Sequence, residues 1–364
     1  MAATPSPAIL DAARLTGDEP ADALAARLAG RFWAVNALLG EVRKNQERLP
    51  EALPDDVRRF FVDRIVVPPW LNRTRVLNAQ HWAERHLFHI TVALFCAALP
   101  SAYAAERGAS VLAATGRMAN DLDRRVNETA RFVLDVLEPG SLDPEGTALP
   151  AIGKVRLLHA AIRRRVQPSN EVPINQEDLL GTMLGFSVVV VRAVRRLGVQ
   201  VDSADAEDFY HLWRGVGALL GIDEALLPKD FSAASRTADC IADRQFQASD
   251  HGRALMARLL ARTEDHVGVP GLRAAPAFLV RYLLGDRTAD ILGIARVSPA
   301  QASLVGTGLF RASVQALALQ LGPLVGRRLL DAIVSAKLGT KDIGFPMPSG
   351  ERSRNRSERE EVLS

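Results

Sequence analysis

The chain has 364 residues, of which 48% are hydrophobic, so it carries enough apolar material for a large buried core. Its net charge of +3 at pH 7 is small for this length, and composition therefore gives no case for a nucleic-acid partner. Aromatic residues make up only 5% of the chain, a low share that suits packed helices better than β-sheets.

Hydrophobic periodicity predicts helices along nearly the whole chain. In the first half, the expected helical segments are 21–48, a helix that opens at Pro54-Asp55-Asp56, 76–99 ended by Pro100, 119–137, and 154–165. In the second half, beyond 200, they are 203–221, 232–247, 250–266, 271–284, 299–320 and 322–337.

One further segment is open to two interpretations. Asn175 resembles a helix N-cap because acidic residues follow it in what would be a first turn. The segment then contains FSVVVVRAV at 186–194, where four consecutive valines could also form a buried strand. The length of the segment and its cap favour a helix buried on nearly all sides.

The sequence contains no internal repeat and no linker long enough to divide the chain. We therefore expect one large all-α domain at 21–338, preceded by a flexible N-terminus at 1–20. The polar end of the chain at 339–364 is expected to be a disordered tail.

The cysteines and the N-terminus predict a cytoplasmic protein. Cys96 and Cys240 are far apart, lie in apolar helical contexts and form no CxxC motif, which is typical of reduced thiols. The N-terminus lacks the pattern of a signal peptide. Arg192 and Arg311 interrupt the longest apolar runs, so no stable membrane insertion is expected.

The segment KVRLLHAAIRRR at 154–165 is the most informative part of the chain. It places Arg156, His159 and Arg163 on one side of a single helix whose other residues are mostly apolar. Burial penalises the two cations unless an anion meets them. A haem would satisfy all three residues, with iron on the histidine and propionates on the arginines. The alternative is a core histidine whose neighbouring arginines reach solvent or pair with acids.

A second polar stripe lies on the predicted helix 119–137. Arg125, Glu128 and Thr129 share one face of this helix, and Phe132 and Val136 continue that face with apolar side chains. Taken alone, the first two residues could be an ordinary surface ion pair. If this helix packs against the one that carries the histidine, the two stripes would face each other across a cavity.

Other candidate sites are weaker. His81, His86 and His89 cluster on the predicted helix 76–99, but no carboxylate stands at ligand spacing, so a structural role is favoured. Asp208 and His211 form an isolated pair without the motifs of a di-iron bundle. The glycine-rich nucleotide-binding and nucleophile-elbow motifs are absent from the sequence.

A series of strings resembles the latex-clearing protein/MpaB oxygenase family, whose members bind haem b. The strings are ATGRM at 114–118, ETARFVLDVLEPG at 128–140, KVRLLHAAIRRR at 154–165, VPINQEDLLGTMLGFSVVV at 172–190, LWRGVGALLGI at 212–222 and RYLLGD at 281–286. They occur in the family's order over most of 60–290. The resemblance implies an all-α fold with a globin-like core wrapped by additional helices, and dioxygen-dependent oxidation of isoprenoid double bonds.

The resemblance also implies roles for the residues of the two stripes. His159 would be the proximal ligand of the haem iron, with Arg156 and Arg163 close to the haem on the same helix, while Arg125 and Thr129 would belong to the haem pocket. The family's latex-clearing members carry an iron-capping lysine where this chain has Glu128, whose carboxylate is suited to proton transfer instead.

The family's upstream catalytic carboxylate cannot be placed by a motif in this chain. Glu106 is the nearest acidic residue.

The sequence therefore predicts a haem b oxygenase that acts on an apolar, isoprenoid-like alkene with dioxygen, and it leaves the oligomeric state open. We expect Phe132, Leu179 and Leu180 to line an apolar substrate channel. Two alternatives are a non-catalytic haem protein for sensing or carriage, and a cofactor-free helical protein that binds a partner.

Overall fold

The computed structural model describes residues 5–114, 122–166, 171–267 and 275–296. Within these ranges the regular structure is helical, and strand pairing is limited to one isolated bridge between Ala105 and Phe246. The predicted all-α fold class is confirmed. The helices expected beyond residue 296 and the expected tail lie outside the described residues.

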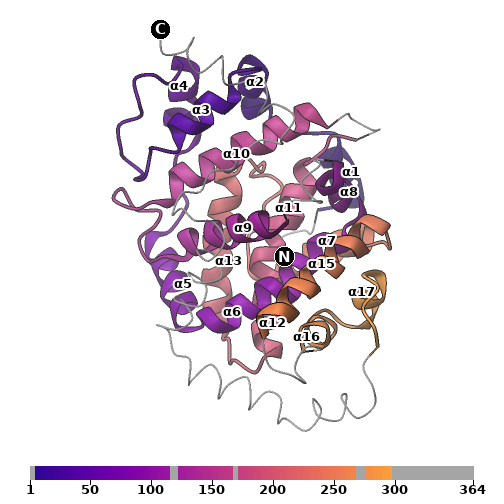
Figure 1. The fold of residues 1–364 in the computed structure, drawn as a ribbon. Helices are drawn as coiled ribbons and strands as arrows, with labels where there is room; N and C mark the ends of the chain where they lie inside the picture. The colour runs from indigo at the N-terminus through magenta and orange to yellow at the C-terminus, as the bar shows by residue number, and fades with distance from the viewer. Residues whose placement is uncertain (1–4, 115–121, 167–170, 268–274, 297–364) are drawn as a thin grey trace.

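The helices follow one another with short connections (Figure 1). Those of the first part are α1 (Pro7–Arg14), α2 (Glu19–Arg27), α3 (Phe32–Leu39), α4 (Asp55–Arg64), α5 (Arg73–Arg85), α6 (Leu87–Ala93), the π-helical turn η1 (Leu94–Ala98), α7 (Leu99–Ala104), α8 (Glu106–Ala114) and α9 (Leu122–Leu137). Those of the second part are α10 (Ala148–Arg165), α11 (Gln176–Leu184), the π-helical turn η2 (Gly185–Val189), α12 (Val190–Arg196), α13 (Ser203–Leu219), α14 (Phe231–Gln245), α15 (Asp250–Val267), α16 (Ala275–Leu284) and α17 (Asp286–Ile291).

Helix α10 separates two apolar cores. On one side it packs against α2, α3 and α4, which gather along its outer face in Figure 1. Leu157, Ala160 and Ala161 supply the α10 contribution to this smaller core. The larger core lies on the other side and is built by α1, α5–α9 and α11–α17, with Ala148, Ala151 and Ile152 of α10. Most residues of α10 are buried because the two cores cover the helix from both sides.

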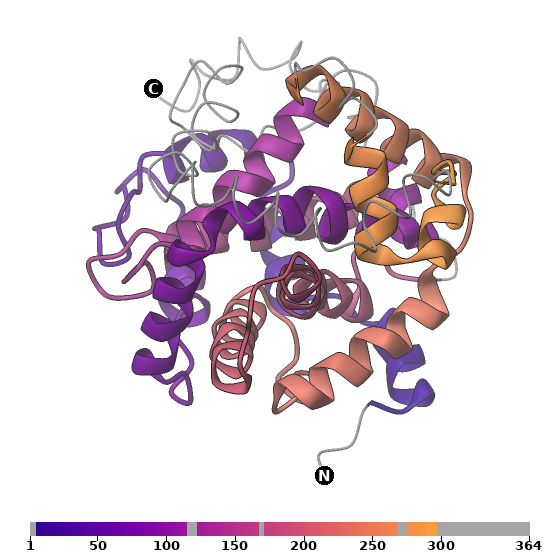
Figure 2. The same cartoon turned by 90° about the horizontal axis from the view of Figure 1, so that it is seen from below.

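The segment with the four valines is a helix in the structure. Asn175 caps it, since its side chain accepts a hydrogen bond from the backbone N–H of Asp178 at 3.0 Å. The helix then continues without a break through α11, η2 and α12, and other helices surround it (Figures 1 and 2). Val188, Val190 and Val191 are fully buried, so the run of valines reflects burial on several sides and not a strand.

The helix expected at 76–99 does not end at Pro100. The chain continues through α6, η1 and α7 to Ala104. Pro100 stands in the first turn of α7, and the π-helical turn directly before it accommodates the missing N–H.

This stretch, Leu87–Ala104, is long and apolar enough to cross a membrane by length and composition, but 67% of it is buried inside the protein, as in the core helix of a soluble protein. A cytoplasmic location stays a prediction.

Two further boundaries differ from the expectation. The predicted helix 21–48 is divided in two, because Gly30 adopts a φ of +78° and ends the first part. The N-terminal segment 1–20 was expected to be flexible, yet α1 lies within it. Leu10 is fully buried in the larger core and Arg14 is held by acidic residues, so tertiary contacts order a helix that is too short to form alone.

Candidate functional site

A cavity of about 770 Å³ lies within the larger helical core. This is the size of an ordinary small-molecule or cofactor site, which spans roughly 300–1,000 Å³. Most of its walls are apolar, and they come from the elements α7–α17. Three of the polar side chains that sequence analysis singled out, His159, Glu128 and Thr129, line this cavity.

His159 reaches the cavity from α10. The two residues that flank it on the same helix face, Leu158 and Ile162, are less than 10% exposed, and both also line the cavity. They pack with Ile174, which precedes α11. His159 therefore presents its imidazole from an apolar wall near the N-terminal end of α11.

The second stripe lies on α9. Glu128, Thr129 and Phe132 all line the cavity, and Glu128 is only 5% exposed. Glu128, Thr129 and His159 therefore line one cavity, but the prediction that the two complete stripes face it does not hold, because Arg156 and Arg163 do not line it. Arg125 also belongs to α9, but its side chain lies outside the described residues.

Arg156 and Arg163 of α10 point away from the cavity. Arg156 donates from Nε to Oδ2 of Asp18 at 2.6 Å and from Nη2 to Oδ1 at 2.9 Å, and it lies over the ring of Phe60. Arg163 donates from Nε to Oδ1 of Asp22 at 2.7 Å. Neither is among the residues that line the cavity. The anions that burial demands come from the protein itself, and a contact of either arginine with a haem stays a prediction.

The residues present fit a haem better than a bare metal ion. Among the described residues, no group of three or more His, Cys, Asp or Glu side chains is placed to hold a metal. A haem iron needs only one or two axial protein ligands, because the porphyrin supplies the other four. One imidazole in a mostly apolar cavity of this size meets that requirement, and His159 is the side chain that would hold the iron.

The cavity follows the continuous helix α11–η2–α12. Its wall includes residues of this helix from Glu177 at one end to Arg196 at the other. The two π-helical turns, which contact each other, contribute Ala98 and Gly185 to the wall. A Cβ added at Gly185 would meet nothing within 4 Å, so this glycine opens directly onto free space. Such π-helical turns occur frequently at functional sites.

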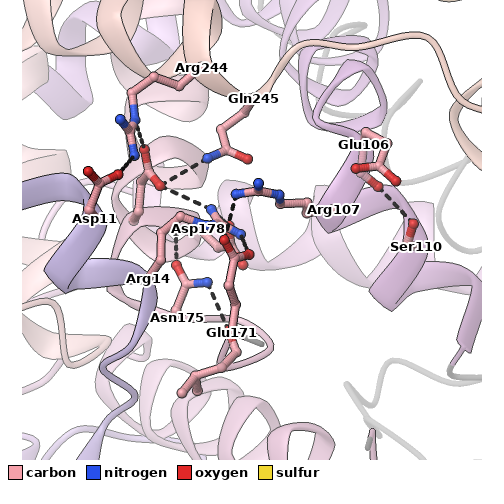
Figure 3. Close-up of polar contacts among 12 residues, drawn as sticks. Asp11, Arg14, Glu106, Arg107, Ser110, Glu171, Asn175, Asp178, Arg244 and Gln245 are labelled. Carbon is pink, nitrogen blue, oxygen red and sulfur yellow. Dashed lines mark hydrogen bonds and ion pairs between the residues drawn. The ribbon is translucent and has the colours of Figure 1, made fainter. Parts of the chain in front are cut away.

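A buried ion-pair network closes the cavity where α11 begins. Glu177 has no exposed side-chain surface, and it accepts hydrogen bonds from Arg14 at 3.0 Å, Arg244 at 2.8 Å and Gln245 at 2.9 Å. Figure 3 shows Arg14, Arg244 and Gln245 converging on this point, with Asp178 beside them. The network joins α1, α11 and α14, and three of its members line the cavity: Glu177, Asp178 and Gln245.

Burial and ion pairing shift the pKa values of side chains in this network. Burial opposes the charge of Arg14, but the hydrogen bonds that it donates to Glu171 and Glu177 and the charges of the neighbouring carboxylates outweigh burial and raise the pKa of the guanidinium. The hydrogen bond from Arg14 lowers the pKa of Glu171, whereas burial raises the pKa of Asp178. The sequence spacing holds no signal for this cluster, because Arg14 is 163 residues from Glu177.

The other candidate residues have structural roles. His89 is buried against the rings of His86 and Phe88, and burial lowers its pKa to about 4. His211 accepts a hydrogen bond from the backbone N–H of Asn72 at 2.8 Å, and burial lowers its pKa to about 4 as well. Asp208 pairs with Arg75. Glu106 begins α8 and is not among the residues that line the cavity.

Residues 78–319 match the family described as ER-bound oxygenase mpaB/B′ and rubber oxygenase, catalytic domain. The chain belongs to this family. A rubber oxygenase from Streptomyces sp. (strain K30) is 26% identical to it over 311 residues, which cover 80% of this chain and 73% of that protein. The solved structure of a latex clearing protein in the closed state superposes with a TM-score of 0.74 at 25% identity, covering 88% of this chain and 90% of the other. The mpaB/rubber oxygenase family resemblance drawn from the sequence strings is confirmed.

Proposed function

We propose that this chain is a haem b-dependent oxygenase that uses dioxygen to oxidise, or oxidatively cleave, an isoprenoid-type alkene. The observation that carries the proposal is the position of His159 on the wall of a mostly apolar cavity that Glu128 and Thr129 also line. Membership of the oxygenase family supports the reaction class. The likeness to a rubber oxygenase supports an unsaturated isoprenoid as the substrate class.

His159 would hold the haem iron. The haem, when bound, would supply the activation of dioxygen, a chemistry that amino-acid side chains lack. Arg125, Thr129, Arg156 and Arg163 are the residues we propose for the propionates. Thr129 is the best supported of these four because it lines the cavity. Arg156 and Arg163 would have to leave or share Asp18 and Asp22 to take part.

Glu128 is the residue we propose for proton transfer. Its side chain lies in the cavity wall and is 5% exposed. A carboxyl group in such a setting can accept or donate a proton at one oxygen without competition from bulk water. In the variant Glu128→Gln, turnover should fall while haem content stays unchanged. Unchanged turnover with haem bound would remove this role.

The apolar wall would bind the hydrocarbon part of the substrate and exclude water. Phe132 and Leu179, which we expected in a substrate channel, do line the cavity. Leu180 was expected there too but is not among the lining residues, because its side chain is fully buried in the larger core. Consecutive helical residues point about 100° apart, so only one of the two leucines can face the cavity squarely.

The proposal is tested by the visible spectrum of the full chain purified from haem-sufficient cells. We expect a Soret band that His159→Ala abolishes or shifts, whereas the control His81→Ala, on the exposed face of α5, leaves it unchanged. Consumption of dioxygen with an isoprenoid alkene should accompany the band. A band without any such consumption would favour a haem carrier or sensor. A folded wild type that shows no band after reconstitution with hemin would contradict the haem site altogether.

A further inference from the structure

The end of the cavity opposite the Arg14 network is rimmed by arginines. Arg192, Arg195 and Arg196 lie in the last two turns of α12, and all three line the cavity. Arg192 is neutralised, since its guanidinium donates to both carboxylate oxygens of Asp239 at 2.5 and 2.9 Å. The other two arginines lie on the protein surface.

Arg195 and Arg196 form no ion pair with a carboxylate within the described ranges. Arg195 donates from Nη2 to the backbone carbonyl of Val201 at 3.1 Å, and its guanidinium lies over the ring of Phe231. Arg196 donates from Nη1 to the carbonyl of Leu283 at 2.5 Å. Among the described residues, these two positive charges at the rim of an apolar cavity therefore have only neutral partners.

The cavity is polarised along its length. From Glu177 to Arg196 the helix α11–η2–α12 rises about 28 Å at 1.5 Å per residue. At the Glu177 end, close to Ile174 and the α10 residues around His159, the charges are buried and mutually compensated. At the Arg196 end, Arg192 is paired with Asp239, whereas the charges of Arg195 and Arg196 are exposed and have no carboxylate partner among the described residues. Between the two ends the wall is mostly apolar.

We propose that the cavity takes an amphipathic substrate, with an apolar isoprenoid-type chain along α11–η2–α12 and an anionic carboxylate or phosphate headgroup at Arg195 and Arg196. The proposal rests on the proposed function, because it names the chemical class of the oxygenase's substrate. Arginine is suited to this task, since its fork of donors matches both anions and its charge strengthens each hydrogen bond. The headgroup at the rim would fix how far the chain enters, and hence which double bond lies in the part of the cavity where His159 stands.

A purely structural role for the two arginines makes a different prediction. Cations at the C-terminal end of α12 stabilise the helix dipole, and their bonds to the carbonyls of residues 201 and 283 tie neighbouring segments together. Such a role is indifferent to the charge of a ligand. Binding measured with matched charged and neutral chains therefore separates the two explanations.

The experiment uses the full-length, haem-loaded protein and three probes with the same chain: farnesyl phosphate, farnesoic acid and farnesol. Calorimetry gives the affinities, and the Soret shift reports whether the chain reaches the haem. We expect both anions to bind about tenfold more tightly than farnesol at low ionic strength, in line with charge-assisted hydrogen bonds, and the gap to narrow as salt is added.

The variants assign the effect to the two residues. The double variant Arg195→Gln/Arg196→Gln should lose about tenfold in affinity for the anions and little for farnesol, while Arg195→Lys/Arg196→Lys should keep much of the preference. Arg59→Gln removes an exposed arginine on α4 that does not line the cavity. It should change neither the affinity for the anions nor that for farnesol.

Three outcomes would overturn the proposal. The first is equal affinity for charged and neutral probes. The second is an equal loss of affinity for charged and neutral probes in the glutamine variant, which would reveal a structural role. The third is loss of haem from the glutamine variant with the lysine variant intact, which would assign the arginines to the propionates. If the chain bound no haem, the proposed function would fail, and the calorimetry on the full chain would still decide whether an anionic chain is preferred.

Discussion

Breaking the ion pair between Arg156 and Asp18 tests whether the protein or a cofactor neutralises this buried arginine. The two side chains are only 8% and 2% exposed, and two hydrogen bonds of 2.6 and 2.9 Å join them. The variant Asp18→Asn keeps the size of the side chain but removes its charge. Removing one partner of a buried pair costs about 3–5 kcal/mol, because the other charge stays buried without compensation.

The measurement is urea unfolding of the protein prepared with and without hemin. With a urea dependence of roughly 3 kcal/mol per molar, the expected midpoint falls by about 1–2 M in both preparations. The control is Asp243→Asn, which breaks the pair with Arg287, where both side chains are more than 60% exposed. An exposed pair of this kind contributes about 0–1 kcal/mol, so its midpoint should hardly move.

An unchanged midpoint for Asp18→Asn without hemin would refute the reasoning. If the urea midpoint fell only without hemin and returned to the wild-type value when hemin was added, a propionate could replace Asp18 beside Arg156. That result would restore the haem contact that the sequence predicts for this arginine.

Three further outcomes are expected from single positions. Gly153→Ala should destabilise the protein by about 1–3 kcal/mol in chemical unfolding, because a Cβ there would lie 2.4 Å from Phe61, whereas equal stability of both proteins would contradict this packing. Gly185→Ala should raise helix stability by up to about 1 kcal/mol yet weaken ligand binding, since the methyl group enters the cavity; tighter binding would argue against that placement. His89 and His211, whose pKa values burial lowers to about 4, remain neutral in the folded state while the unfolded chain takes up protons below about pH 6.5. Their contribution to stability is therefore present at pH 7 and lost as the pH falls towards 4, by about 2 kcal/mol for each histidine at pH 5. The free energy of unfolding should therefore be lower at pH 5 than at pH 7, and His211→Gln should reduce this difference.

Much of the fold could be predicted from local sequence patterns. The Asn175 cap and the apolar run after it were sufficient to predict the helix that forms the long wall of the cavity. Spacing along α9 and α10 likewise brought Glu128, Thr129 and His159 to one cavity. These features depend on neighbours within a few residues, which is the range over which periodicity and capping act.

The features that escaped prediction depend on contacts between distant segments. Whether Arg156 meets a cofactor or an acid is decided by Asp18, which lies 138 residues away in the chain. The ordering of α1 depends in the same way on the anchoring of Arg14 by Glu177. No pattern within a window of one or two turns records such partners.

The two π-helical turns have a consequence for how the chain tolerates insertion and deletion. Each turn holds one residue more than an α-helical turn requires. The extra residue sets the direction in which all later side chains of the same helix point. Deleting one residue from 185–189 would let α11 run into α12 as an ordinary α-helix and rotate the following residues by about 100°. Arg192 would then leave the cavity wall although the helix itself survived. In this protein the shape of the cavity is thus encoded partly in the residue count of two helical turns, independently of which side chains occupy them.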